Sequence, residues 1–161
     1  MFQVLLVCTG NTCRSPMAEG ILKSLLPAEL AGNLRIVSAG TGALPGTPAA
    51  ALAVSTMASQ GIDIRGHQSV LLTAGMVRES DLILGMEPQH LDRARELAPE
   101  AAARIHLITV HGAGGGGNPG GVADPIGAGA DTYQDTFHRI RSHLLRWIPV
   151  IREQMERRER V

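Results

Sequence analysis

The chain has 161 residues with 15 basic and 15 acidic side chains, so its net charge is zero when the histidines are neutral. A hydrophobic content of 44% and a mean hydropathy of +0.07 are typical of one globular domain over residues 1–161. The balanced charge argues against a nucleic-acid-binding surface, and no apolar run approaches the roughly 20 residues that cross a bilayer.

The chain opens with an apolar run that predicts a first strand. Residues 4–7 are continuously apolar, as in a strand buried on both faces. Ser15 and Pro16 predict the start of a helix, with Ser15 as the N-cap and Pro16 as the first helical residue. Residues 8–14 therefore form a loop that meets free backbone N–H groups and the positive end of a helix dipole, which together bind anions.

This loop, Cys8-Thr9-Gly10-Asn11-Thr12-Cys13-Arg14, has the composition of a site for a tetrahedral anion. The pKa of a thiol falls at a helix N-terminus and beside a cation, so we expect Cys8 to be a thiolate nucleophile at neutral pH. Arg14 offers a planar fork of donors that binds two oxygens of such an anion. Asn11 and Ser15 are suited to hydrogen bonds that hold the loop open, and Ser15 can also donate to the departing thiolate. A cysteine and an arginine at this spacing also occur by chance, but the preceding strand and the following Ser-Pro favour a functional loop.

Both cysteines, Cys8 and Cys13, lie in this loop, so they cannot link distant parts of the fold. Two thiols without a nearby histidine pair are too few ligands for a zinc site. Two interpretations of Cys13 stay open: a reversible disulfide that protects Cys8 from irreversible oxidation, or a small buried side chain. The basic stretch of a secretory signal is absent, since the first lysine is Lys23, so we expect a cytoplasmic protein. We also expect a monomer.

The rest of the chain alternates predicted strands with predicted helices, which indicates a parallel sheet with helices on both faces. Such sheets bind ligands beyond the carboxyl ends of their strands, where the Cys8 loop lies. An apolar stripe that includes Trp147 marks the last helix as amphipathic, and Pro149 should kink or interrupt it. The second predicted strand covers residues 34–37 and ends in Ser38-Ala39-Gly40, and the third and fourth cover 81–86 and 104–110. The predicted helices cover 48–60, 74–79 after a Thr73 cap, 88–97 and 131–158.

A glycine-rich run, residues 111–121, follows the last predicted strand and formally contains a dinucleotide-binding pattern. No helix follows it, so that motif lacks its structural context, and we expect a mobile loop instead. Asp124-Pro125 comes next, at the same sheet edge as Cys8. Thiolate attack on phosphorus requires a proton for the leaving group, and Asp124 is the candidate acid that later activates water. By itself, Asp-Pro would indicate only a turn.

The segment Val7–Glu19 resembles the signature of the low-molecular-weight protein-tyrosine phosphatases. The segments Ser38-Ala39-Gly40-Thr41, Asp81–Met86 and Asp124-Pro125 are similar to that family as well, so the resemblance covers nearly the whole chain. It implies an α/β fold of three layers, αβα, with a four-stranded parallel sheet and the phosphate-binding loop after the first strand. It also implies a cysteine-dependent enzyme that acts on phosphorylated protein substrates without a metal or an organic cofactor.

The same resemblance assigns roles to single residues. It implies that Cys8 forms a phosphocysteine, that Arg14 binds phosphate and that Asp124 is the general acid. The phosphate-binding residues that it implies are Thr9, Gly10, Asn11, Thr12, Cys13, Arg14 and Ser15.

Two departures from the tyrosine-specific members concern the substrate. Those members usually carry a bulky aliphatic residue where Thr12 stands, and aromatic residues after Asp-Pro and after Ser-Ala-Gly. Only 2% of this chain is aromatic, too little to line a deep slot for a phosphotyrosine ring. Thr12 and the glycine-bearing loop after Asp124 are instead similar to the bacterial protein-arginine phosphatases, and both side chains are reasonable partners for a guanidinium group. We therefore expect a phosphoarginine phosphatase, with a phosphotyrosine phosphatase as the alternative.

Two further alternatives are weaker. An arsenate reductase on this scaffold would need additional redox cysteines near residues 81–90, and that segment contains none. A non-catalytic phosphoprotein-binding module would be expected to have lost Cys8 or Asp124, and the chain retains both.

Overall fold

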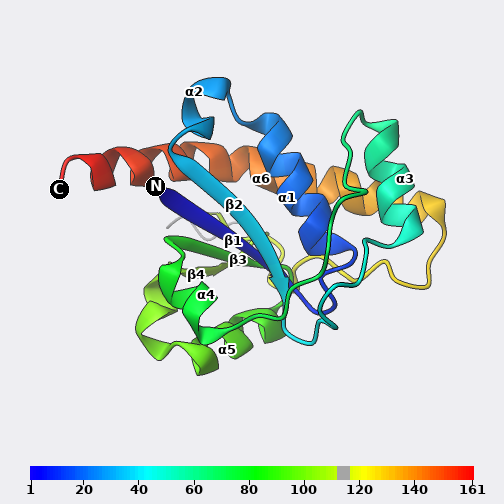
Figure 1. Ribbon diagram of the computed structural model, residues 1–161, viewed down its shortest axis with the longest axis horizontal. Coiled ribbons are helices and arrows are strands. Elements are labelled where there is room, and N and C mark those ends of the chain that lie inside the picture. Colours follow the sequence, from blue (N-terminus) through cyan, green and yellow to red (C-terminus); the bar gives the residue numbers. More distant parts are fainter. Residues whose placement is uncertain (112–116) are drawn as a thin grey trace.

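The computed structural model describes residues 1–111 and 117–161, and within them lies a sheet of four parallel strands (Figure 1). The strand order is β2-β1-β3-β4, which agrees with the α/β fold expected from the sequence. The central strand pairs on both edges, so that Leu5 lies beside Val37 on one side and Ile83 on the other. The strands are β1 (Phe2–Cys8), β2 (Leu34–Gly40), β3 (Leu82–Gly85) and β4 (Ile105–Leu107).

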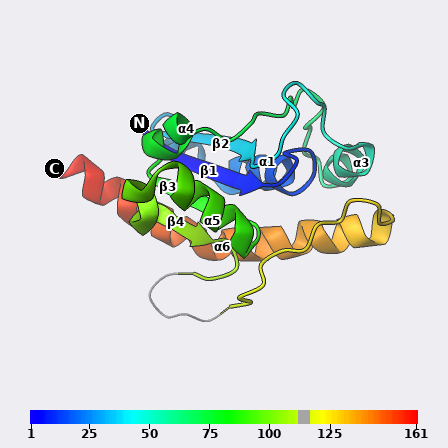
Figure 2. The same cartoon turned by 90° about the horizontal axis from the view of Figure 1, so that it is seen from below.

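Helices cover both faces of this sheet, and the long α6 runs the length of the molecule (Figure 2). One layer holds α1 (Arg14–Leu25), α3 (Ala51–Ser59) and α6 (Ala130–Glu159), which contact one another. The other holds α4 (Ala74–Glu79), α5 (Pro88–Leu97) and the 3-10 helix η1 (Pro99–Arg104), and a short α2 (Ala28–Ala31) precedes β2. None of the helices in the described residues combines the length and the apolar character that crossing a membrane requires.

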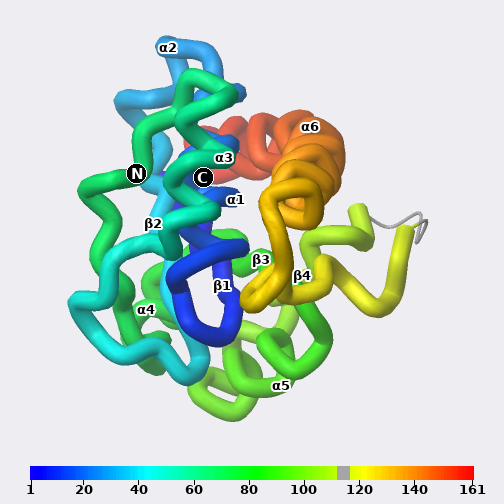
Figure 3. Tube along the Cα trace, turned by 90° about the vertical axis from the view of Figure 1, so that its right-hand side faces the viewer, coloured from blue at the N-terminus to red at the C-terminus, as the bar shows by residue number. Residues whose placement is uncertain are grey.

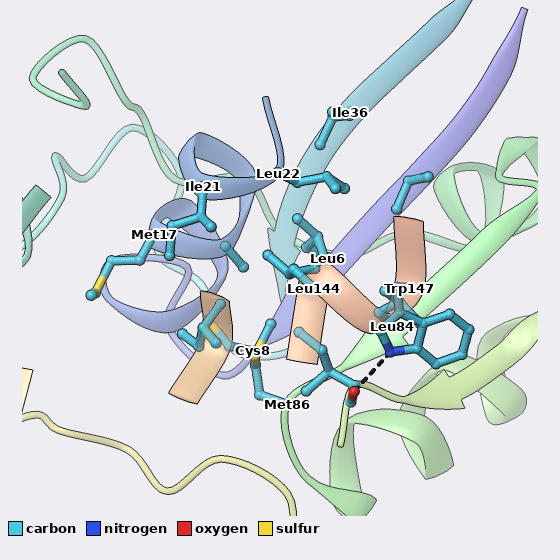
Figure 4. Packing of buried hydrophobic residues seen from close by; sticks show 14 of the residues in the cluster. Leu6, Cys8, Met17, Ile21, Leu22, Ile36, Leu84, Met86, Leu144 and Trp147 are labelled. Carbon is cyan, nitrogen blue, oxygen red and sulfur yellow. Dashed lines mark hydrogen bonds between the residues drawn. The ribbon is translucent and has the colours of Figure 1, made fainter. Parts of the chain in front are cut away.

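The two faces of β1 supply two separate cores, as its continuous apolar sequence predicted. Val4 and Leu6 belong to the core under α1, α3 and α6, whereas Leu5 and Val7 belong to the core under α4 and α5. Trp147 lies in the first core with 1% of its surface exposed (Figure 4). Its indole Nε1 donates a 2.7 Å hydrogen bond to the carbonyl oxygen of Ile108, which satisfies the polar atom of a buried ring.

Of the two effects expected of Pro149, a kink or an interruption, the interruption does not occur, because α6 continues through it. A proline removes one backbone donor, and the carbonyl that loses its partner is that of Leu145, one turn earlier. Both Pro149 and Leu145 are exposed, so water can bind the free carbonyl oxygen. Trp147 and Ile151 flank the proline on the buried side and hold the helix to the core.

The start of α1 also differs from expectation. The helix begins at Arg14 after Cys13, two residues earlier than Pro16. Ser15 does not cap it, because its hydroxyl bonds to Cys8 and Asn11 instead. Pro16 is tolerated at the third helical position because the first N–H groups of a helix have no intrahelical partner. Thr73, by contrast, does cap α4, since its hydroxyl accepts a 3.2 Å bond from the backbone N–H of Met76.

Other predicted bounds were approximate. The second strand ends at Gly40, as predicted, whereas the fourth ends at Leu107, before the predicted Val110. The predicted helix over 48–60 forms only from Ala51 to Ser59. The glycine-rich run that predicted a mobile loop falls largely on residues 112–116, which lie outside the described residues.

Two neighbouring leucines of α6 test which side of this helix stabilises the fold. Leu144 is fully buried, whereas 42% of Leu145 is exposed. Leu144→Ala should lower the free energy of unfolding by about 2–5 kcal/mol, because it removes buried methyl groups and leaves a cavity. Leu145→Ala is the matched control and should change it by less than about 0.5 kcal/mol. Urea denaturation of both variants measures the difference, and equal losses would contradict this packing.

Candidate active site

The loop between β1 and α1, called here the Cys8–Arg14 loop, lies at the carboxyl edge of the sheet. Figure 3 shows it between the loop after β2 and the segment that leads into α6. The left-handed conformation within this loop falls on Asn11, with a φ of 54°. Asparagine tolerates this conformation better than most residues, particularly where its side chain is hydrogen bonded.

Asn11 is completely buried and bonds in three directions. Its Nδ2 donates to Ser15 Oγ at 2.7 Å and to Ser38 Oγ at 3.0 Å. Its Oδ1 accepts from the backbone N–H of Val70 at 2.8 Å. Its carbonyl oxygen lies 2.7 Å from Nε2 of His67. The side chain therefore joins the loop to α1, to β2 and to the segment around residue 70.

Gly40 explains the Ser-Ala-Gly motif at the end of β2. A Cβ atom at this position would collide with the carbonyl oxygen of Thr9 and lie 2.9 Å from the backbone nitrogen of Asn11. The backbone of Gly40 also makes two hydrogen bonds to the segment around residue 71. Its N–H donates to the carbonyl oxygen of Val70, and its carbonyl oxygen accepts from the N–H of Leu72. Only glycine allows β2 to approach the Cys8–Arg14 loop this closely.

Cys8 lies at the floor of the site with 2% of its surface exposed. Its Sγ is 2.8 Å from Ser15 Oγ, and the backbone N–H of Asn11 donates to it at 3.3 Å. Burial raises the pKa of the Cys8 thiol, while the bonds from Ser15, the charge of Arg14 and the bond from Asn11 lower it. Burial prevails, so the lowered pKa expected from the sequence is wrong for the unliganded chain. Loop composition alone did not reveal how completely this sulfur is removed from water.

Arg14 is a buried cation, 1% exposed, whose charge is balanced by two carboxylates. Its Nη1 pairs with Glu87 Oε1 and donates to the carbonyl oxygen of Val122 at 2.9 Å. Its Nη2 lies 3.4 Å from Asp124 Oδ2 and 3.5 Å from Thr9 Oγ1. Nη2 is therefore the nitrogen that faces Asp124, the more exposed of the two carboxylates.

Asp124 is the most exposed of these groups, with 38% of its side chain accessible. Its Oδ1 accepts from the backbone N–H of Ile126 at 3.1 Å, which fixes the carboxylate in the loop before α6. Beside it lies a hollow of about 140 Å³. The residues that line this hollow are Cys8, Thr9, Gly10, Thr12, Cys13, Arg14, Asp124 and Ile126.

The structure thus brings Cys8, Arg14 and Asp124 to one hollow, as the sequence predicted. Two of the predicted phosphate-binding residues, Asn11 and Ser15, do not line it, and both are fully buried. Among the residues that the structure describes, no group of three or more His, Cys, Asp or Glu side chains is placed to hold a metal ion.

Cys13 is also buried, and both cysteines are free thiols in this structure. The Cys13 Sγ lies 3.3 Å from the hydroxyl of Tyr133 on α6, within the first core. Burial raises the pKa of Tyr133, so the phenol keeps its proton near neutral pH. These contacts favour a packing role for Cys13, and its redox role stays a prediction.

Sequence reasoning missed two residues at the start of α5. Glu87 follows β3 at the carboxyl edge of the sheet and pairs with Arg14. His90, one turn later and 1% exposed, lies 2.8 Å from Thr9 Oγ1 through its Nε2. An acidic residue directly after a predicted strand and before a proline was the signal that could have indicated Glu87, because parallel strands end at a common edge. No pattern in the sequence pointed to His90.

Comparison with known proteins places this geometry in a family. The family model described as "Low molecular weight phosphotyrosine protein phosphatase" matches residues 3–159. The chain is 34% identical to the probable low molecular weight protein-tyrosine-phosphatase EpsP of Ralstonia nicotianae, over 92% of this chain and 95% of that protein. It is 33% identical to the low molecular weight protein-tyrosine-phosphatase Wzb of Escherichia coli, over 89% of this chain and 91% of that protein.

Solved structures of two kinds of phosphatase share the fold. The YwlE arginine phosphatase from Geobacillus stearothermophilus superposes with a TM-score of 0.83 at 30% identity, covering 97% of both chains. The tyrosine phosphatase AmsI of Erwinia amylovora has a TM-score of 0.80 at 30% identity, covering 92% of this chain and 91% of the other. With its family match over nearly the full length and a thiol, an arginine and an aspartate around one hollow, the chain belongs to the low-molecular-weight protein-tyrosine phosphatase family.

Proposed function

We propose that this phosphatase hydrolyses phosphoarginine in phosphorylated proteins through a phosphocysteine intermediate on Cys8. The observation that carries the proposal is the lining of the hollow, which contains Thr12 and Asp124 but no aromatic side chain among the described residues. The leaving group of phosphoarginine is planar, polar and cationic. A carboxylate and a hydroxyl can both bind such a group, whereas a phosphotyrosine ring requires apolar walls.

The first step forms a bond between sulfur and phosphorus and breaks the N–P bond of the substrate. The proton of the Cys8 thiol first passes to the Asp124 carboxylate. The resulting thiolate attacks phosphorus, and Asp124 passes that proton to the departing guanidine nitrogen. Arg14 Nη2 and the loop N–H groups stabilise the charge that spreads over the equatorial phosphoryl oxygens. Because Nη1 is already held by Glu87, Arg14 needs little reorganisation when the phosphoryl group binds.

The second step returns the enzyme to its starting state. Asp124 takes a proton from a water molecule, the water oxygen attacks phosphorus, and the S–P bond breaks to release phosphate. Ser15, whose hydroxyl lies 2.8 Å from the sulfur, stabilises the departing Cys8 thiolate by donating a hydrogen bond.

A phosphotyrosine phosphatase is the second candidate, favoured by the names of relatives such as EpsP, Wzb and AmsI. Ile126, 65% exposed at the mouth of the hollow, offers one apolar wall for a ring. A non-catalytic phosphoprotein-binding module fits less well, because a binder needs neither the buried Cys8 sulfur nor Asp124. Monomeric state and cytoplasmic location stay predictions from the sequence.

Substrate preference tests the proposal through Thr12. Wild-type enzyme should hydrolyse phosphoarginine peptides with higher kcat/KM than phosphotyrosine peptides of the same flanking sequence. Thr12→Ile removes the hydroxyl and adds an apolar group, so the ratio should shift toward phosphotyrosine by about tenfold or more. Thr132→Ile, an exposed threonine of α6, is the control. A wild-type preference for phosphotyrosine would refute the phosphoarginine assignment, and an unmoved ratio would remove Thr12 as the selector.

Asp124→Asn tests the acid. The amide cannot deliver a proton, so the rate should fall by about 100-fold or more for substrates with poor leaving groups, such as phenyl phosphate. The loss should be smaller for para-nitrophenyl phosphate, whose leaving group needs little protonation. Steady-state kinetics of both substrates measure the difference, with Asp135→Asn on the exposed side of α6 as the control. Equal losses with both substrates would argue against proton transfer by Asp124.

Ser15→Ala tests the activation of the nucleophile. Without the hydroxyl that stabilises the thiolate, the pKa of Cys8 should rise further above its ordinary value. The pH dependence of inactivation by iodoacetamide reports this pKa, and its midpoint should move to higher pH. Ser24→Ala, on the same helix, should leave the midpoint in place. A midpoint that moves to lower pH in Ser15→Ala would show that the hydroxyl stabilises the thiol instead.

A further inference from the structure

We propose that His90 is a positioning residue, which holds the side chain of Thr9 so that the Thr9 hydroxyl donates a hydrogen bond to the phosphoryl group in the hollow. The inference deepens the proposed function and rests on it, because it concerns the same phosphoryl site. It adds a side-chain donor to those of Arg14 and the loop backbone.

The position of His90 is set by the start of α5. Glu87 is the N-cap of this helix and His90 is its third residue, and the two form a reciprocal capping box. The backbone N–H of Glu87 donates to His90 Nδ1 at 2.9 Å. The imidazole is 1% exposed, so its orientation is fixed by packing as well as by this bond.

This bond determines which ring nitrogen carries the proton. A backbone N–H can only donate, so Nδ1 of His90 must be the acceptor and must be unprotonated. Burial, followed by the charge of Arg14, lowers the pKa of His90 to about 4, while the carboxylates of Glu87 and Asp124 act in the opposite direction. At neutral pH the ring is therefore neutral, with its single proton on Nε2.

The proton on Nε2 in turn orients Thr9. His90 Nε2 lies 2.8 Å from Thr9 Oγ1, so the imidazole donates and the hydroxyl oxygen accepts. Arg14 Nη2 makes a longer contact of 3.5 Å with the same oxygen. Two N–H donors thus face the Thr9 oxygen, and its own proton is left for a different acceptor.

That acceptor is supplied by the substrate. Thr9 directly follows Cys8 and lines the hollow together with Arg14 and Asp124. A phosphoryl oxygen bound there is anionic and accepts hydrogen bonds, most strongly when negative charge builds up in the transition state. Glu87 and His90, one turn apart on α5, therefore control the two side chains of the loop, those of Arg14 and Thr9, that face the phosphoryl group.

Three variants distinguish the hydrogen bond that His90 donates to Thr9 from the other contacts of the histidine. His90→Asn places a carbonyl oxygen near the position of Nδ1, which keeps the bond from Glu87 but removes the donor to Thr9. His90→Gln places an amide N–H near the position of Nε2 and restores that donor. Thr9→Val removes the hydroxyl itself. His138→Asn, at an exposed position of α6, is the control for a histidine-to-asparagine change.

Steady-state kinetics with para-nitrophenyl phosphate measure the effect of each variant on catalysis. His90→Asn and Thr9→Val should each lower kcat/KM by about fivefold, the effect of one hydrogen bond that forms when the phosphoryl group binds and strengthens in the transition state. His90→Gln should recover most of that loss. The double variant His90→Asn/Thr9→Val should be no slower than Thr9→Val, because His90 acts through Thr9. Losses that multiply in the double variant, or a His90→Asn enzyme as fast as wild type, would overturn the inference.

Two measurements do not depend on turnover. Ring ¹⁵N NMR of wild-type protein should find His90 as the Nε2–H tautomer at pH 7, and the Nδ1–H tautomer would overturn the inference even if no variant folds. The affinity for inorganic phosphate should fall in His90→Asn and recover in His90→Gln. If wild-type protein hydrolyses neither phosphoarginine nor phosphotyrosine, the proposed function fails. The inference is then decided by the phosphate affinities, and unchanged affinities refute it.

Discussion

The geometry of the site depends on one buried asparagine. Asn11 adopts a left-handed conformation in the middle of the Cys8–Arg14 loop, and its amide bonds to Ser15, Ser38 and the backbone of Val70. Because each partner comes from a different part of the fold, the loop can close only when α1, β2 and the segment around residue 70 are in place. The backbone N–H of Asn11 also donates to the sulfur of Cys8, so the residue that shapes the loop also contributes to the environment of the proposed nucleophile.

The electrostatics of the site are determined by the burial of the Arg14 guanidinium next to the Cys8 thiol. Arg14 is removed from water and is compensated by Glu87 and Asp124, because a buried charge without partners would be strongly destabilising. Burial raises the pKa of the Cys8 thiol by more than the bond from Ser15 and the charge of Arg14 lower it. Binding of a phosphoryl group would give Arg14 a further anionic partner, so the unliganded and liganded sites differ in charge balance.

The first residues of α5 both cap their own helix and contact the Cys8–Arg14 loop. Glu87 and His90 complete a capping box that stabilises the helix, and the same two side chains reach Arg14 and Thr9. A local helix-capping motif thus also orders a loop about 75 residues earlier in the chain. These contacts connect the start of α5 to the Cys8–Arg14 loop without involving Cys8.

Short-range sequence patterns were sufficient to predict the parallel sheet and the position of the candidate site. The apolar run before Cys8, the alternation of strands and helices and the spacing of Cys8 and Arg14 are all short-range patterns, and they indicated the parallel sheet and the loop at its edge. Asp124 was also predictable, because it follows the last strand at that edge. The bounds of α1 were not, since Ser15 bonds within the loop instead of capping the helix.

The partners of the loop could be identified only from the folded chain. Glu87, His90, Ser38 and Val70 are far from the loop in sequence. The first three meet it because β2 and β3 end at a common edge, and Val70 meets it because its carbonyl oxygen accepts a bond from Gly40 at the end of β2. The raised pKa of Cys8 also could not be predicted from the sequence, because it depends on how much water the surrounding elements exclude. A sequence pattern can identify the reactive groups, but solvent exclusion and contacts between distant segments arise only when the core is packed.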